Sequence, residues 1–243
     1  MIFRKVLILI PAYNEEANIA TTIANIKKFT KGKGWDILVV DDGSKDKTYL
    51  KAKKCEVIVV RHPFNMGYGV AIQTGYKFAI DGGYDILVQI DADGQHDPKY
   101  IPKMINTLRR EKLDVVIGSR FRKKTDYHAP FMRRLGMILF SLIVSAVTRR
   151  KVTDSTSGYQ VIDKKVLNFL SSDSFPCDYP DADLLIMLYF AGFKVDEIPM
   201  KMYENKTGKS MHGSLIKNFY YVMKMSLSIL TIVLRKVTGL PSF

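Results

Sequence analysis

Cysteine is scarce in this sequence, and long uncharged apolar runs are absent from it. The two cysteines, Cys55 and Cys177, lack the spacing of a metal site and belong to no disulfide framework, which fits a reducing compartment. Because no segment has about 18 consecutive uncharged apolar residues, we expect no conventional transmembrane helix. With 243 residues, 47% of them hydrophobic, the chain can bury a sizeable core, which argues against disorder.

Acidic residues are also in the minority. The chain has 24 aspartates and glutamates against 37 lysines and arginines, a formal net charge of +13. Such an excess predicts an anionic partner, which could be nucleic acid, a negatively charged membrane surface or a phosphorylated substrate. Charge alone does not choose among the three.

The first half of the chain alternates short apolar runs with segments of helical periodicity. Strands are predicted at residues 6–10, 37–40, 57–60, 86–90 and 115–118, and helices at residues 15–29 and 70–80. Repeated units of this kind predict an α/β fold with a mainly parallel, doubly wound sheet and helices on both faces. Ligands of such sheets bind beyond the carboxyl ends of the strands, and each predicted strand here runs into polar residues.

The fourth predicted strand ends in two carboxylates, Asp91 and Asp93. If the backbone stays extended there, both side chains project from the same face. Two hard oxygen donors suit Mg²⁺ or Mn²⁺, ions that usually also bind a substrate phosphate. A solvated DADG turn is the alternative, since Asp and Gly both favour turns. The sequence therefore predicts a metal-bound diphosphate as ligand.

Five motifs, in this order and spacing, resemble family 2 glycosyltransferases, which have the nucleotide-sugar-binding GT-A fold. They are PAYNEE (11–16), VVDDGS (39–44), NMGYGVAIQTG (65–75), DADGQHDP (91–98) and GSRF (118–121). The resemblance covers roughly residues 5–205. Within the family, DSTSGYQ (154–160) and an acidic residue before GFKVDEIP (192–199) are most similar to the dolichyl-phosphate mannose synthase and polyprenyl-phosphate glucosyltransferase branch.

The resemblance implies a donor site. Around the nucleoside it places Pro11, Tyr13, Glu15, Val40 and Asp42. Around the diphosphate it places Asp91, Ala92, Asp93 and Arg120, with Asp91, Asp93 and Gln95 as metal ligands. The metal would neutralise charge on the departing nucleoside diphosphate, so Asp93 counts as catalytic. Helix capping by residues 14–16 and a plain surface arginine at position 120 are the structural alternatives.

The resemblance also implies an acceptor site. It places Asp154 and Asp183 beside the acceptor, where a hydroxyl acceptor would need a general base and a lipid phosphate would not. A turn residue and a helix N-terminal acid are the alternatives for these two positions. The loop NKTGKSMHGS (205–214) resembles one that closes over phosphate, with Lys206 and Lys209 as its cations and Met211 where a lysine is common.

Two further segments have a wide apolar face and a narrow polar stripe at helical spacing. In residues 135–148 the stripe is Ser141, Ser145 and Thr148; in residues 215–235 it is Lys217, Tyr221, Lys224, Ser228, Thr231 and Arg235. Basic residues flank the first segment at Arg133, Arg134, Arg149, Arg150 and Lys151. We expect both helices to lie in a headgroup layer or against another subunit, with burial in the core as the alternative.

Other functions fit less well. The glycines at 67 and 69 lack the third glycine of a dinucleotide fingerprint, because Ile72 stands there. A nucleic-acid partner is not expected, since no known module is present and the basic residues flank apolar helices. A catalytically silent relative is disfavoured by the intact acids.

We therefore expect a GT-A domain over residues 1–205, which includes the helix near 131–150, and a basic loop with an amphipathic helix over residues 206–243. The expected activity is metal-dependent, inverting transfer of a hexose from a UDP- or GDP-sugar to a polyprenyl or dolichyl phosphate. The enzyme would be peripheral, at the cytoplasmic face of the membrane, and could form homo-oligomers. Extension of a glycan or cell-surface polysaccharide by a family 2 enzyme is the alternative.

Overall fold

The computed structural model describes residues 5–122, 131–172, 175–176, 178, 180–203 and 215–238, without the side chains of residues 131–133 and 215–219. The predicted domain boundary at residue 205 lies outside these ranges and stays a prediction. So do the contacts of Lys206, Lys209 and Met211.

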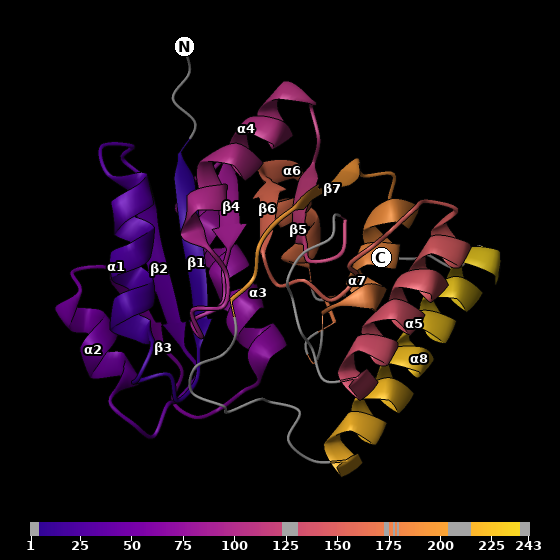
Figure 1. Cartoon of the computed structure of the whole chain (residues 1–243), viewed down its shortest axis with the longest axis horizontal. Helices are drawn as coiled ribbons and strands as arrows, with labels where there is room; N and C mark the ends of the chain where they lie inside the picture. The colour runs from indigo at the N-terminus through magenta and orange to yellow at the C-terminus, as the bar shows by residue number, and fades with distance from the viewer. Residues whose placement is uncertain are drawn as a thin grey trace.

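A seven-stranded sheet crosses the molecule (Figure 1). Its strands are β1 (Val6–Ala12), β2 (Asp36–Asp41), β3 (Ile58–Arg61), β4 (Ile86–Gln89), β5 (Val115–Ser119), β6 (Gln160–Asp163) and β7 (Val195–Pro199). They are arranged in the order β3-β2-β1-β4-β6-β5-β7, and β6 alone runs antiparallel to its neighbours. The mainly parallel sheet confirms the predicted fold class.

Helices cover both faces of the sheet. On one face, α1 (Ile19–Thr30), α2 (Thr48–Lys54) and α4 (Ile101–Arg110) pack over the alternate strand residues Ile8, Ile10 and Val39. On the other face, Leu7, Leu9 and Leu38 meet the remaining long helices. These are α3 (Tyr68–Asp81), α5 (Phe131–Thr148), α6 (Lys164–Leu170), α7 (Ala182–Phe190) and α8 (Leu215–Thr238). Because β1 is buried along its whole length, its continuous apolar run identified it correctly.

The helix predicted from residue 15 begins later, at Ile19. The backbone N–H groups of Glu15 and Glu16 donate instead to Thr48 Oγ1 (2.7 Å) and Asp46 Oδ2 (3.1 Å), which ties this turn to the loop after β2. The cap of α1 is Asn18, whose side chain makes no capping hydrogen bond. Residues 14–16 therefore hold the β2 loop and also contact the helix start, because the carbonyl of Glu15 accepts the backbone N–H of Ile19 at 2.9 Å.

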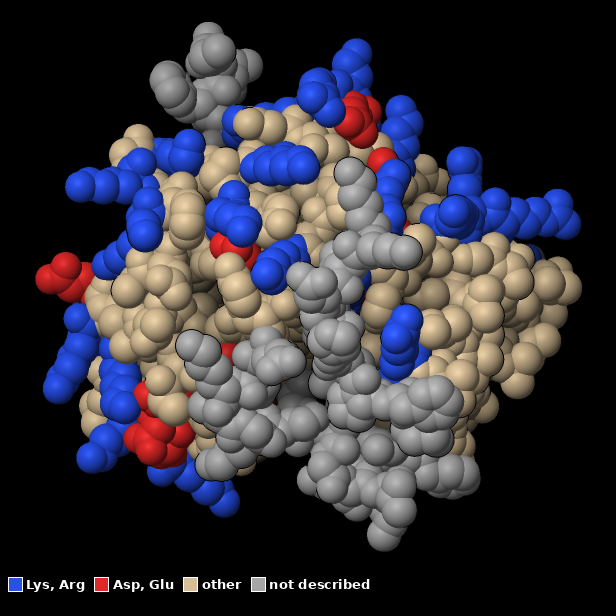
Figure 2. Space-filling view, in the orientation of Figure 1, with Lys and Arg blue, Asp and Glu red and all other residues tan. Residues whose placement is uncertain are grey.

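Helices α5 and α8 lie side by side at one edge of the molecule (Figure 1). Both pack against α7. Figure 2 shows charged side chains over much of this view and a largely uncharged expanse over α5 and α8. Among the helices that the structure describes, none combines the length and apolar character needed to cross a bilayer.

Candidate functional site

Asp91 follows the buried strand β4, and two neighbours hold its carboxylate and its backbone. Tyr68, the first residue of α3, donates its hydroxyl to Asp91 Oδ1 at 2.9 Å. His96 Nδ1 accepts the backbone N–H of Asp91 and lies 3.5 Å from Asp91 Oδ2. Burial lowers the pKa of His96 to about 4, so its ring is neutral at neutral pH and the approach to Asp91 is not an ion pair. Tyr68 therefore orients this carboxylate, while His96 holds the backbone N–H of the same residue.

Gly158 of the DSTSGYQ segment packs directly against the same carboxylate. A methyl group on Gly158 would lie 2.9 Å from Asp91 Oδ2 and 2.8 Å from the Tyr68 hydroxyl. Glycine is thus required by close packing, in addition to the turn that the sequence predicted. The contact brings the expected acceptor segment against the expected metal-binding acids.

Asp93 and its neighbours form the rest of the turn after β4. Asp93 Oδ1 accepts the backbone N–H of Gln95 at 3.0 Å, and Gln95 donates its side-chain amide to the carbonyl of Tyr203 at 3.2 Å. The buried Ala92 accepts a hydrogen bond from Thr22 through its carbonyl oxygen. Hydrogen bonds from both sides thus define the shape of the DADG turn.

Negative charge gathers where the turns after β1, β2 and β4 meet. The pKa of Glu15 is raised, first by burial and further by the carboxylates of Asp93, Asp91 and Asp46, against a hydrogen bond from Asn18. The donor set fits a divalent cation whose remaining ligands come from a substrate diphosphate. Within the described residues, no three His, Cys, Asp or Glu side chains group as a cation site, and the roles of Asp91, Asp93 and Gln95 as metal ligands stay a prediction.

Asp42 lies in this region, but its carboxylate serves the protein. It accepts hydrogen bonds from His62 Nδ1 (2.7 Å), Asn65 Nδ2 (2.9 Å) and the backbone N–H groups of Met66 and Gly67 (2.8 and 2.9 Å). These four contacts tie the loop before α3 to the end of β2. The predicted contact of Asp42 with the nucleoside stays a prediction. A nucleoside would have to share this carboxylate with the four hydrogen-bond donors that already contact it.

The other nucleoside-site residues differ in exposure. Pro11 lies in β1 and is buried, and the side chain of Val40 belongs to the core. Tyr13 is 41% exposed beside Asn14, whose φ of 54° turns the chain toward the β2 loop. Of Pro11, Tyr13 and Val40, only Tyr13 has a side chain exposed enough to contact a ligand, so the other two predicted contacts stay predictions.

Arg120 and Asp154 form a buried ion pair. Arg120 Nε lies 2.7 Å from Asp154 Oδ2, which also accepts the Arg120 backbone N–H at 2.9 Å, and the guanidinium reaches Asp154 Oδ1. Glu197 of β7 accepts the backbone N–H groups of Thr153 and Asp154 and so fixes this segment. Both carboxylate oxygens of Asp154 are engaged, which suits a positioning role better than proton abstraction.

Two acids stand at the start of α7. Asp183 is buried and accepts hydrogen bonds from Ser228 Oγ (2.6 Å) and the backbone N–H of Leu184 (2.7 Å). Asp181 accepts the hydroxyl of Tyr221 at 2.8 Å. Burial raises the pKa of Asp181 to about 6; Asp183 and Asp91 add to the rise, while Tyr221 and Arg120 oppose it. Asp181 therefore lies within electrostatic reach of both the donor acids and the Arg120 pair.

Three residues of this site, Tyr68, His96 and Asp181, were not predicted from the sequence. Tyr68 was visible only as part of a glycine-containing motif, His96 followed the acid pair without an assigned role, and Asp181 stood two residues before the acid chosen there. The repeated pattern Asp-Ala-Asp at 91–93 and 181–183 is the signal that could have identified Asp181.

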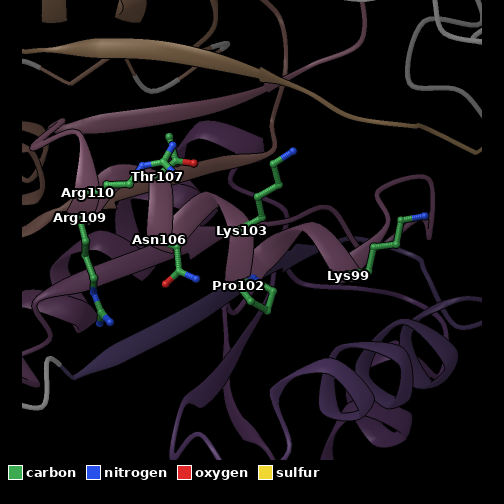
Figure 3. A pocket seen from close by; sticks show the side chains of 7 residues that line it. All are labelled: Lys99, Pro102, Lys103, Asn106, Thr107, Arg109 and Arg110. Carbon is green, nitrogen blue, oxygen red and sulfur yellow. The ribbon is translucent and has the colours of Figure 1, made fainter.

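A separate basic groove lies on α4 and the turn before it (Figure 3). Its walls are Lys99, Pro102, Lys103, Asn106, Thr107, Arg109 and Arg110. None of these residues belongs to the cluster of acids described above.

Comparison with known proteins identifies the family of this chain. The model of glycosyl transferase family 2 matches residues 7–170. The UDP-N-acetylglucosamine–dolichyl-phosphate N-acetylglucosaminyltransferase of Methanococcus voltae is 33% identical over 215 residues, covering 81% of this chain and 84% of its own. The dolichol-phosphate mannosyltransferase of Pyrococcus furiosus is 31% identical over 251 residues, covering 97% and 68%.

A solved structure shares the architecture. Glucosyl-3-phosphoglycerate synthase from Mycobacterium tuberculosis, crystallised with Mn²⁺, uridine diphosphate and glucosyl-3-phosphoglycerate, superposes with a TM-score of 0.70 at 21% identity, covering 98% of this chain and 81% of its own. At that identity the likeness establishes the fold. The matches confirm the predicted family, fold and enzyme class: this chain belongs to glycosyl transferase family 2, has the GT-A fold and is a glycosyltransferase.

Proposed function

We propose that this enzyme transfers a hexose, with inversion, from a nucleoside diphosphate sugar to a polyprenyl phosphate at a membrane surface, with Mg²⁺ or Mn²⁺. The observation that carries the proposal is the position of the acceptor-side acids. They lie between the acid pair after β4 and two helices with exposed apolar faces. The two dolichyl-phosphate transferases among the relatives support the choice of acceptor.

On the donor side, Asp91 and Asp93 would hold the metal with the diphosphate. A bound divalent cation neutralises charge that grows on the leaving nucleoside diphosphate. Tyr68 and Gly158 hold the Asp91 carboxylate and His96 holds its backbone N–H, so little reorganisation is needed when the donor binds. Tyr13 would offer its exposed ring to the base.

On the acceptor side, Asp181 is the acid best suited to handle a proton. A phosphate monoester has a second pKa near 6. Because burial holds the pKa of Asp181 at about 6, it can accept the remaining proton of the acceptor phosphate near neutral pH. The anionic phosphate oxygen then attacks the sugar carbon, and the nucleoside diphosphate leaves. Arg120, fixed by Asp154, adds positive charge nearby.

The membrane part of the proposal rests on α5 and α8. Their outer faces expose Leu135, Ile138, Leu139 and Leu142 on α5, and Val222, Met223, Leu227, Leu230, Leu234 and Val237 on α8. Contiguous exposed apolar surface of this kind marks an interaction site. Basic residues adjoin it at Arg134, Arg149, Arg150, Arg235 and Lys236. A lipid surface with anionic headgroups fits both features, and it is where a polyprenyl phosphate resides.

The direct test is transfer of radiolabel from UDP-glucose, UDP-N-acetylglucosamine or GDP-mannose, each supplied separately, into organic-extractable material. The reaction contains a short polyprenyl phosphate and Mg²⁺ or Mn²⁺, with a parallel reaction in EDTA. We expect metal-dependent labelling of the lipid phase from one of these donors.

Two results would contradict the proposal in different ways. Donor cleavage without lipid labelling would discard the lipid acceptor and direct attention to glycan hydroxyls. Full labelling in EDTA, after the protein has been stripped of metal, would discard the role assigned to Asp91 and Asp93.

A further inference from the structure

Part of each polar stripe, Ser141 and Ser145 on α5 and Tyr221, Lys224 and Ser228 on α8, is buried or half-buried on the side away from the exposed apolar faces. On α8, Tyr221 donates to Asp181 (2.8 Å) and Ser228 donates to Asp183 (2.6 Å). The two donors are seven residues apart, which is two helical turns, so they stand on one face of α8. Lys224, between them, forms an ion pair with Asp178. One face of α8 therefore contacts three acids around the start of α7.

Helix α5 makes an equivalent set of contacts with the segment that contains Asp154. Ser145 Oγ accepts the backbone N–H of Val152 at 3.0 Å and also lies 3.2 Å from its carbonyl oxygen. Ser141 Oγ accepts the backbone N–H of Ser155 at 3.2 Å and lies 3.3 Å from the carbonyl oxygen of Thr153. The residues on either side of Asp154 are thus held by α5.

Other hydroxyl groups on these helices make only local bonds. Thr148 donates to the carbonyl of Val144, and Thr231 donates to the carbonyl of Leu227, each four residues earlier in its own helix. Tyr220, next to Tyr221 in sequence, is 47% exposed and its hydroxyl meets Lys224. Thr148, Thr231 and Tyr220 therefore carry hydroxyl groups like those of Ser141, Ser145, Tyr221 and Ser228, but their described hydrogen bonds stay within their own helix.

We propose that Ser141 and Ser145 on α5, and Tyr221 and Ser228 on α8, are positioning residues that couple the seating of both helices on a lipid surface to the geometry of the acceptor acids. The proposal rests on the proposed function. When the outer faces of α5 and α8 enter the headgroup layer, the helices move less. Because the hydroxyls of these four residues bind segments 152–155 and 181–183, those segments move less as well. Binding to the lipid surface would then fix the acceptor acids in position before a polyprenyl phosphate from the same surface binds.

The groups that face Asp181 make its placement sensitive to α8. Tyr221 approaches it from α8, Asp183 from α7 itself, Arg120 from the end of β5 and Asp91 from the end of β4. Tyr68 of α3 interacts electrostatically with it as well. Of these partners, only Tyr221 lies on a helix with an exposed apolar face. A change in α8 therefore reaches the acid directly through the hydrogen bond of Tyr221, and indirectly through Ser228 and Asp183, which accepts the backbone N–H of Asp181 at 3.2 Å.

The test uses Tyr221→Phe and Ser228→Ala, with Tyr220→Phe and Thr231→Ala as matched controls on the same helix. Vesicles of phosphatidylglycerol and phosphatidylcholine contain a long-chain polyprenyl phosphate. We expect kcat of the first two variants to fall about tenfold, since each loses a hydrogen bond to a charged group. Their KM for the donor and their binding to vesicles should stay within twofold, and the controls should match the wild type.

Hydrogen exchange supplies a second measurement that does not depend on transfer. Vesicles without acceptor should slow amide exchange in peptides covering residues 152–155 and 181–184 of the wild type. In Tyr221→Phe and Ser228→Ala, the slowing at residues 181–184 should be lost although the protein still binds the vesicles. Thermal unfolding of each variant confirms that it is folded.

The outcomes separate this proposal from the proposed function. If the wild type labels lipid but Tyr221→Phe and Ser228→Ala behave like the controls in both measurements, the proposed coupling is wrong and the proposed function stands. If no donor labels lipid, the function fails, and hydrogen exchange still decides the coupling. Absence of vesicle-induced protection in the wild type would overturn the coupling in either case.

Discussion

The donor and acceptor regions of the site hold their acids in different ways. Around the donor, Asp42 is fixed by groups of the loop 62–67, and Asp91 by Tyr68 and His96, all within the α/β core. Around the acceptor, Asp181 and Asp183 are fixed by hydroxyls of α8, a helix whose other face is exposed and apolar. The acids of the proposed donor region are therefore held by the α/β core, whereas Asp181 and Asp183 of the proposed acceptor region are held by a helix with an exposed apolar face.

The largest effect is expected in the donor region. Asp93→Asn should lower turnover by about 10³-fold, because the metal-binding carboxylate acts on charge that develops in the transition state. Thermal stability should change little, since Asp93 lies in a surface turn. Steady-state transfer assays and calorimetry check both points. Asp81→Asn, at the exposed end of α3, is the control; a comparable loss in that variant would contradict the assignment.

Breaking the buried ion pair between the two regions should reduce stability. Asp154→Asn leaves the guanidinium of Arg120 buried without its counter-charge, at a cost of about 3–5 kcal/mol in the free energy of unfolding. Chemical denaturation measures the loss. The exposed pair of Arg122 and Asp196 gives a matched control, because Asp196→Asn should cost at most about 1 kcal/mol. Equal losses in both variants would show that burial of the pair is unimportant.

Gly158→Ala tests the close packing of Gly158 against Asp91 and Tyr68. The added methyl group would press on Asp91 Oδ2 and the Tyr68 hydroxyl, so the carboxylate must move. We expect turnover to fall about 10–100-fold, since small misplacement of a reacting group is costly. Gly136→Ala on α5, where a methyl group meets no atom within 4 Å, should leave turnover unchanged. Normal activity of Gly158→Ala would contradict the packing.

A smaller effect concerns pH. Because burial raises the pKa of Asp181 to about 6, the folded state binds this proton more tightly than the unfolded state, where a carboxyl group has its ordinary pKa near 4. The contribution of Asp181 to stability is therefore greatest below pH 4 and declines as pH rises to 6. Asp181→Asn should raise the free energy of unfolding at pH 7.5 by about 1–3 kcal/mol, and the gain should vanish near pH 4. A gain independent of pH would contradict the raised pKa.

Features formed by neighbouring residues could be predicted from the sequence, whereas features formed by contacts distant in sequence could not. The buried runs of β1 and β4 and the acids that follow β4 are local features, so strand positions and the pair Asp91 and Asp93 could be identified. Strands β6 and β7 were missed because their places in the sheet depend on pairing with β4 and β5, which are distant in sequence.

Side-chain partners were harder to predict for the same reason. The pairing of Arg120 with Asp154 joins residues 34 positions apart, and that of Ser228 with Asp183 joins residues 45 positions apart. The polar stripes of α5 and α8 were recognised by their spacing, but spacing does not say which acids they meet. Tyr68 and Asp181 were overlooked because their roles exist only once the chain is folded.

The most direct test of the account is to measure transfer to two acceptors with one variant. Leu227→Glu combined with Leu230→Glu places charge on the outer face of α8, while Leu50→Glu places it on the exposed Leu50 of α2 as a control. The account predicts that the α8 variant loses vesicle binding and labels long-chain polyprenyl phosphate in vesicles at least about tenfold less, yet labels a short, water-soluble polyprenyl phosphate at no less than half the wild-type rate. Equal labelling of vesicle-borne acceptor by the α8 variant and the wild type would contradict it.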